Sequence, residues 1–292
     1  MGWIQVRSDK FKNIEMFSFG EIPQHAELRA LFEDLYLRYN RREFVHPDPV
    51  ELLYCYQETG DREVAALLAA ALAYGRASQI VKKASQVLEV MGASPKGFVL
   101  SHSLKELQKV FKDFKHRFTD GKSVAGLFYG IRGVLLEYGS LEMCAECYVN
   151  EGHLKAKEAI TGLFESLLRH GMPSSVLPDP RKPSACKRLY LFLKWMIRKD
   201  SIDPGGWSAL KPSELIYPLD THIFSIARAL GATDRKSADF KAALDVTEFF
   251  RRINPLDPLK YDFVLTRFGI RPDLNKKEFL EICCGNRMKK GH

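Results

Sequence analysis

The segment from Asp61 to Gly75 constrains the fold more than any other part of the chain. Apolar residues recur in it at the spacing of one helical face, at Val64, Leu67, Leu68, Ala71 and Leu72. Alanines at 65, 66, 69, 70 and 73 fill most of the other faces. A helix that is apolar nearly all round is buried on several sides. We therefore expect a central helix here, with Asp61 as its N-cap.

Helical spacing also dominates the rest of the sequence. Alternation with period two, which indicates strands, is scarce outside the first few residues. The pattern predicts further helices at about 24–41, 49–58, 104–118, 123–138, 154–169, 184–199, 220–230, 236–252 and 258–268. The last of these has Asp257 as N-cap, and the proline-rich residues 171–183 form the clearest loop. The chain is predicted to be all-α.

Basic residues outnumber acidic ones. The 44 Lys and Arg against 36 Asp and Glu give a formal charge of +8 and a pI of about 9.1. This balance favours a polyanionic partner, although a generic basic protein has the same composition. No uncharged apolar run reaches the ~20 residues of a membrane span, and no secretory leader precedes the six cysteines. We expect a cytoplasmic protein with free thiols and no membrane contact.

Asp220 has two interpretations. By spacing it is the N-cap of the helix at 220–230, with its carboxylate accepting backbone N–H bonds. The string Leu219-Asp220-Thr221-His222-Ile223-Phe224, followed by Ile226 and Arg228, also resembles the catalytic segment of endonuclease III and its relatives, the helix-hairpin-helix DNA glycosylases. In that superfamily the aspartate both caps its helix and faces the sugar of the extruded nucleotide. The resemblance implies that Asp220 is catalytic and that His222 contacts DNA.

A second string is similar to an early segment of the same glycosylases. It runs from Leu67 through Tyr74, Gly75 and Arg76 to Ser78, as an apolar helix that breaks into a polar turn. In the superfamily this turn approaches the lesion and its opposite strand. The resemblance implies that Tyr74 and Arg76 wedge into the duplex. The alternative is that Tyr74 is a core residue and Arg76 a solvated helix end.

Lys187 matches the position of the nucleophilic lysine in bifunctional members of the superfamily. That lysine lies near the start of the helix after the hairpin and attacks C1′ of the flipped nucleoside, which gives a Schiff base. A nucleophilic amine needs desolvation or nearby positive charge, and Arg188, Lys194 and Arg198 lie close to the same helical face. A solvated basic face explains these charges equally well.

The sequence departs from the superfamily pattern around Lys187. No Leu-Pro-Gly-Val-Gly hairpin precedes it, only the turn from Pro178 to Pro183. The 33 positions between Lys187 and Asp220 exceed the usual separation, and the extra residues include the turn that ends at Trp207. A longer, atypical hairpin of this kind resembles the archaeal 8-oxoguanine DNA glycosylases and a bacterial branch related to them.

Trp207 and the cysteines are the other candidates for binding a base or a cofactor. Trp207 is either a platform that stacks on a flipped base or a core plug between helices. Cys144 and Cys147, with Cys283 and Cys284 far away, lack the close spacing of an iron–sulfur cluster. We therefore expect no metal and no cofactor.

These observations predict a two-lobed all-α bundle of the helix-hairpin-helix glycosylase type. A central barrel at 60–170 forms one lobe, and residues 1–59 with 171–292 form the other. The expected activity is excision of a damaged, possibly oxidised, base from double-stranded DNA by a monomer at the nucleoid. Abasic-site lyase activity through a Schiff base on Lys187 is expected to accompany it. Lys187 and Asp220 are the expected catalytic pair, and the expected DNA or base contacts are Tyr74, Arg76, Arg188, Lys194, Arg198, Trp207 and His222. The alternatives are a non-catalytic binder of DNA or RNA and a structural helical domain.

Overall fold

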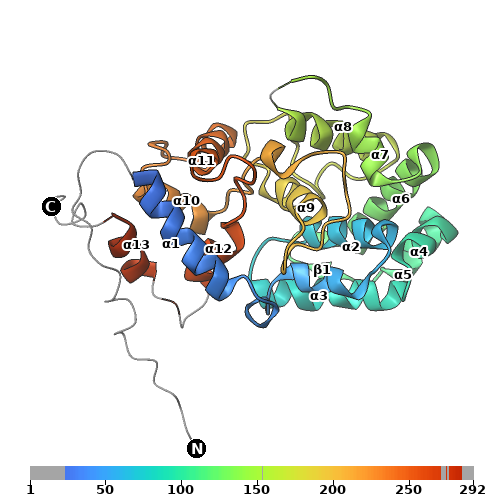
Figure 1. Ribbon diagram of the computed structural model, residues 1–292. Coiled ribbons are helices and arrows are strands. Elements are labelled where there is room, and N and C mark those ends of the chain that lie inside the picture. Colours follow the sequence, from blue (N-terminus) through green and yellow to red (C-terminus); the bar gives the residue numbers. More distant parts are fainter. Residues whose placement is uncertain (1–23, 153, 271–273, 275, 285–292) are drawn as a thin grey trace, which may run out of the picture.

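The computed structural model describes residues 24–152, 154–270, 274 and 276–284. The regular secondary structure of these residues is helical apart from one short two-stranded hairpin (Figure 1). The predicted all-α class is therefore confirmed. None of the helices in this part of the chain has the length and apolar character needed to cross a membrane.

Helix α2 (Thr59–Ala71) is the central helix, as predicted, and every residue from Glu63 to Ala71 is buried. Its neighbours on several sides are η3 (Pro49–Cys55), α3 (Ala77–Met91), α4 (Pro95–Ser101) and α9 (Lys187–Ile197). The predicted cap is wrong, because α2 begins two residues before Asp61. The Asp61 carboxylate instead accepts hydrogen bonds from the Ser94 hydroxyl and the Lys96 amide at the start of α4.

The helices form two groups, which Figure 1 shows side by side. Around α2 lie η3, α3, α4 and α9, with α5 (Leu104–Val110), α6 (Gly121–Tyr138), α7 (Leu141–Glu146) and α8 (Lys155–Arg169). The second group contains α1 (Gln24–Tyr39), α10 (Thr221–Ala229), α11 (Phe240–Ile253), α12 (Asp262–Ile270) and α13 (Lys276–Cys284). Two short 3₁₀ turns, η2 (Arg42–Phe44) and η4 (Pro212–Glu214), lie in the connections.

The two groups differ from the predicted lobes at η3 and α9. Both fall in ranges assigned to the second lobe, yet both pack against α2 in the first group. The reason is that α2 is apolar on every face and needs covering on all sides. The apolar faces of η3 and α9, which include Leu53 and Leu193, supply part of that cover.

The helix predicted at 104–118 is too long. Helix α5 ends at Val110, and the chain then forms β1 (Lys115–His116), which pairs antiparallel with β2 (Thr119–Asp120). Asp120 takes an extended conformation because it caps α6, accepting a hydrogen bond from the Ser123 amide at 2.8 Å. Phe118, expected on the buried face of a helix, lies instead at the hairpin tip and is 85% exposed.

Other helix boundaries also differ from the predicted ones. The helix predicted from Pro258 begins at Asp262. Asp257 therefore does not cap this helix, and its carboxylate binds Arg198 instead. The segment predicted as a helix at 49–58 is the 3₁₀ helix η3. Four helices, α3, α4, α7 and α13, have no counterpart among the predicted ranges.

Glycines in α6 allow close contact with α8 and the loop that follows it. A Cβ at Gly130 would lie 2.9 Å from the carbonyl oxygen of Leu167 and 2.9 Å from Cβ of Met172. We expect Gly130→Ala to destabilise the protein by about 1–3 kcal/mol, although alanine is the better helix former. Urea unfolding measures this change. Leu136→Ala, at a 63% exposed position of the same helix, should change stability by about 0.5 kcal/mol or less. Equal stability of Gly130→Ala and the native protein would contradict the close packing.

Candidate active site

Lys187 and Asp220 meet where the two helix groups adjoin. Nζ of Lys187 lies 3.3 Å from Oδ2 of Asp220, although 33 positions separate the residues in sequence. Lys187 is the first residue of α9, and Asp220 is the N-cap of α10. The lysine side chain is 36% exposed and the aspartate side chain 12%. The structure thus brings together the two residues that the sequence singled out, at a partly exposed position.

The two carboxylate oxygens of Asp220 have separate partners. Oδ1 accepts a hydrogen bond from the Ile223 amide at 2.8 Å, which confirms the predicted cap. Oδ2 faces the amine of Lys187. A helix N-terminus favours a carboxylate because its amides are unpaired and its dipole is positive. Capping therefore holds Asp220 in place while one oxygen stays directed at Lys187.

Cys186 sets the direction in which α9 begins. Its backbone is left-handed, with φ of 44° and ψ of 39°, a conformation that few residues other than glycine adopt. The amide of Cys186 donates to the Ser184 hydroxyl, and its thiol lies 3.5 Å from the Asp179 carbonyl oxygen. Burial raises the pKa of this thiol. Cys186 therefore shapes the turn before Lys187 and is held as a buried thiol.

Arg188 fastens α9 to the end of α2. Its Nη1 donates to the carbonyl oxygens of Ala71 at 2.6 Å and Val176 at 2.7 Å. The guanidinium carbon lies 5.2 Å from the centre of the Tyr74 ring. Burial lowers the pKa of Arg188. This side chain, expected to contact DNA, is occupied by backbone carbonyls, so its place in the fold is to join two helices.

Tyr74 connects the contact between Arg188 and the end of α2 to the hairpin of β1 and β2. Its half-buried hydroxyl lies 2.9 Å from the His116 carbonyl oxygen and 2.6 Å from the Thr119 hydroxyl. Its ring packs on the His116 ring, with centroids 4.8 Å apart. Tyr74 thereby holds the hairpin beside the C-terminal end of α2. Arg76, the other residue of the predicted wedge, is exposed at the N-cap of α3.

The hairpin tip is the feature that the sequence patterns missed. The backbone of Arg117 is left-handed, with φ of 49°. The guanidinium carbon of Arg117 lies 5.6 Å from the centre of the exposed Phe118 ring. Phe118 is the last residue of the helix predicted at 104–118. The available signal was Asp120 before Gly121, because a capping residue there requires extended chain between two helices.

The predicted contacts of Lys194 and Arg198 with DNA are wrong. Both residues are buried, at 2% and 3% exposure, among aspartates. Lys194 Nζ lies 2.9 Å from Asp262 and 3.5 Å from Asp203. Charges neutralised in this way do not provide the unpaired positive field that was expected beside Lys187. The spacing along α9 did not reveal these partners, because they come from other segments.

Trp207 and His222 also lie elsewhere than expected. Trp207 is 5% exposed and donates from Nε1 to Glu63 at 3.1 Å, so its interpretation as a base-stacking platform is wrong and the core alternative holds. The ring of His222 packs on α12, where a Cβ at Gly269 would come within 2.5 Å of it. This packing directs His222 towards α12.

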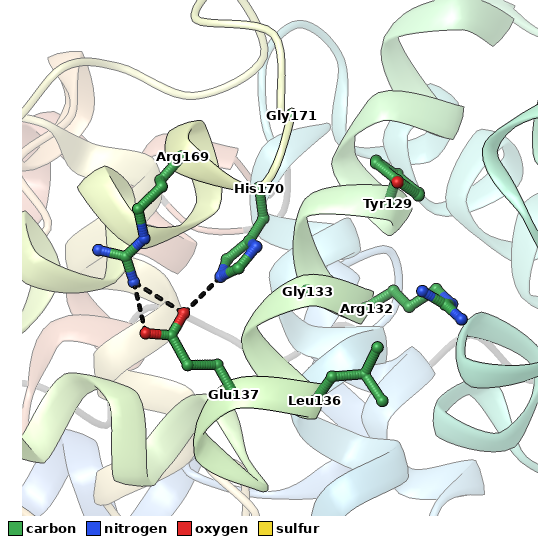
Figure 2. A pocket seen from close by; sticks show the side chains of 8 residues that line it. All are labelled: Tyr129, Arg132, Gly133, Leu136, Glu137, Arg169, His170 and Gly171. Carbon is green, nitrogen blue, oxygen red and sulfur yellow. Dashed lines mark hydrogen bonds and ion pairs between the residues drawn. The ribbon is translucent and has the colours of Figure 1, made fainter.

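A surface hollow of about 690 Å³ lies over α6 and the end of α8, and its lining includes neither Lys187 nor Asp220. Figure 2 shows the carboxylate of Glu137 directed at both Arg169 and His170. The Arg169 and His170 contacts with Glu137 are 2.8 and 2.5 Å, so the two basic groups share one carboxylate. Arg169 and His170 in this hollow are therefore paired with Glu137.

Metal ligation finds no support in the described part of the chain. It contains no group of three or more His, Cys, Asp or Glu side chains arranged to hold an ion. Cys55, Cys144, Cys147 and Cys186 are free thiols.

Residues 48–271 match a family described as a protein of unknown function (DUF2400). The chain belongs to this family. The DUF2400 segment spans both Lys187 and Asp220, the hairpin and all helices from α2 to α12, while α1 precedes it. No curated protein and no solved structure matches the chain.

Glu63, on α2, is a buried carboxylate within the DUF2400 segment. Its oxygens accept hydrogen bonds from the Leu141 and Glu142 amides at the start of α7 and from Trp207 Nε1. Burial raises the pKa of Glu63 to about 7, and these hydrogen bonds oppose the shift only in part. The folded protein therefore binds a proton here that the unfolded chain releases near its ordinary pKa of 4.5.

This shift predicts the sign of a stability change with pH. Because the folded-state pKa is the higher one, stability from Glu63 is full below about pH 4.5 and is lost as the pH rises to about 7. Glu63→Gln keeps an acceptor oxygen and removes the titration. We expect the melting temperature to fall less between pH 5 and 8 in this variant than in the native protein. Parallel pH profiles in the two proteins would contradict the raised pKa.

Proposed function

We propose that the protein is a DNA glycosylase with abasic-site lyase activity, acting on a damaged base in double-stranded DNA. The observation that carries the proposal is the 3.3 Å contact between Lys187 Nζ and Asp220 Oδ2 at the starts of α9 and α10. The two residues match the lysine and aspartate of the superfamily that the sequence resembles. A chance match of Asp220 by its string and of Lys187 by its position gives no reason for their side chains to meet.

In the proposed reaction the pair acts on a sugar carbon. In the expected reaction the unprotonated amine of Lys187 donates its lone pair to C1′ as the bond from C1′ to the base nitrogen breaks. The base leaves with that electron pair and takes up a proton. Opening of the sugar ring then gives a Schiff base at C1′, which permits strand cleavage. Asp220 is the acceptor within reach of the ammonium proton, and its charge stabilises the cationic sugar.

The hairpin tip supports a double-stranded substrate. Tyr74 and Arg188 connect it to the start of α9, so it projects from the same region as Lys187. An enzyme that extrudes a base leaves a gap in the stack, and apolar side chains commonly fill such gaps. Phe118, with Arg117 beside it, is a side chain of this kind.

Borohydride trapping tests the chemistry. The native protein should form a covalent adduct with a duplex that carries an abasic site or a susceptible lesion. Lys187→Ala should abolish the adduct, and Asp220→Asn should slow its formation by about a hundredfold. Lys182, an exposed lysine in the loop before α9, provides the matched control. Lys182→Ala should form the covalent adduct as the native protein does.

Two results would contradict the assignment: no adduct with the native protein across a panel of lesions, or an undiminished adduct with Lys187→Ala. Salt-sensitive DNA binding that survives Asp220→Asn, without cleavage of any lesion, would favour the non-catalytic binder instead.

Phe118→Ala tests the wedge. Stacking on a base contributes about 1–3 kcal/mol, so we expect excision from duplex DNA to slow by about 5- to 100-fold. Trapping on a single-stranded abasic site should change much less, because no stack is opened there. Leu256→Ala removes a comparably exposed apolar side chain, 82% exposed and outside the hairpin, and should leave both rates unchanged. Equal losses on duplex and single strand would contradict this role.

A further inference from the structure

A buried cluster of charged residues lies along the second half of α9 and just beyond it. Lys194 contacts Asp203 and Asp262. Arg198 contacts Asp200 at 3.0 Å and Asp257 at 2.9 Å, and it also binds Asp203. Asp203 is fully buried, and burial raises its pKa to about 6. None of these residues belongs to the proposed chemistry.

The cluster joins the two helix groups. Lys194 belongs to α9, which packs on α2, whereas Asp262 is the first residue of α12. The hydroxyl of Tyr36 on α1 donates to Asp200 at 3.0 Å, which adds a contact with the second group. Helix α12 in turn packs against α10, the helix that Asp220 caps. The same ionic contacts therefore fix α9 relative to the helices that support Asp220.

The geometry of α9 relates the cluster to the candidate site. Lys187 and Lys194 are seven residues apart, which is two helical turns or about 10 Å along the same face. A small rotation or shift of α9 against α12 would therefore move Lys187 relative to Asp220. Ionic hydrogen bonds resist such movement more than apolar contacts do, because their strength depends on direction.

Tyr217 lies in the segment that leads to Asp220. It precedes Asp220 by three positions and is fully buried, and its ring centroid lies 5.0 Å from that of Phe250. Burial and the carboxylates of Asp262 and Asp220 raise the pKa of Tyr217 well above its ordinary value. Its packing on Phe250 of α11 anchors the segment that ends in Asp220 to the second helix group.

We infer that Lys194 and Asp262 are positioning residues, which hold α9 and α12 in the arrangement where Lys187 meets Asp220. The inference rests on the proposed function for its catalytic consequence. The contact itself does not depend on that function, so the geometry can be measured without DNA.

The double variant Lys194→Met/Asp262→Leu tests the inference. It removes both charges and keeps apolar volume, so a folded protein is expected where a single substitution leaves a buried charge unpaired. We expect DNA affinity within about twofold of native and a single-turnover excision rate at least about tenfold lower, because misplaced reacting groups lose rate more than binding. Leu163→Ala, in the core of α8, lowers stability without touching the cluster and should keep the native rate per folded molecule.

A second readout follows the amine of Lys187 by NMR after reductive methylation with ¹³C-formaldehyde. Lys187→Arg assigns the signal, and Asp220→Asn gives its position when the ion pair is lost. The double variant should move the signal towards that position, while Lys194→Arg, which keeps the charge, should leave it near native. Asp257→Asn, whose side chain is 23% exposed, is the milder variant if the double variant does not fold, and should shift the signal in the same direction.

An unmoved Lys187 signal in the folded variant, or a native excision rate, overturns the positioning role. Absence of trapping by the native protein, together with a shifted signal in the double variant, overturns the proposed chemistry and supports the positioning role.

Discussion

The packing of α9 on α2 is the contact on which the candidate site depends. Helix α2 is buried on every face, so the helix that covers its C-terminal half has a fixed orientation. Arg188 completes the joint by satisfying the carbonyl oxygen of Ala71, the last residue of α2, which would otherwise be an unpaired buried acceptor. With Arg188 turned towards α2, its neighbour Lys187 faces the second group of helices and Asp220.

Four basic residues of α9 and its end have three different environments. Lys187 faces a capping carboxylate, Arg188 binds backbone carbonyls, and Lys194 and Arg198 are enclosed by aspartates. Each environment satisfies a buried or half-buried cation, as burial demands. The basic character of this helix therefore belongs mostly to internal architecture, and Lys187 is the member of the set that combines exposure with a reactive partner.

The candidate site lies near several helix starts, and residues close in sequence determine where each of these helices begins. A left-handed Cys186 begins α9, Asp220 begins α10, and Asp120 begins α6 directly after the exposed hairpin tip. Helix starts leave unpaired amides and a positive dipole, which suit the anionic groups of a nucleic acid as well as capping carboxylates. Tyr74 and Arg188 link two of these starts through the end of α2.

The sequence by itself determined the all-α class, the central position of α2, the cap at Asp220 and the choice of Lys187 and Asp220. These follow from helical periodicity and capping, which act within a few residues, and from two short strings that resemble a known superfamily. Only the tertiary structure decided the partners of Lys194, Arg198 and Trp207. It also decided the exposure of Phe118 and the helix group in which α9 packs. Those depend on contacts between segments far apart in the chain, such as Arg198 with Asp257, which no local pattern encodes.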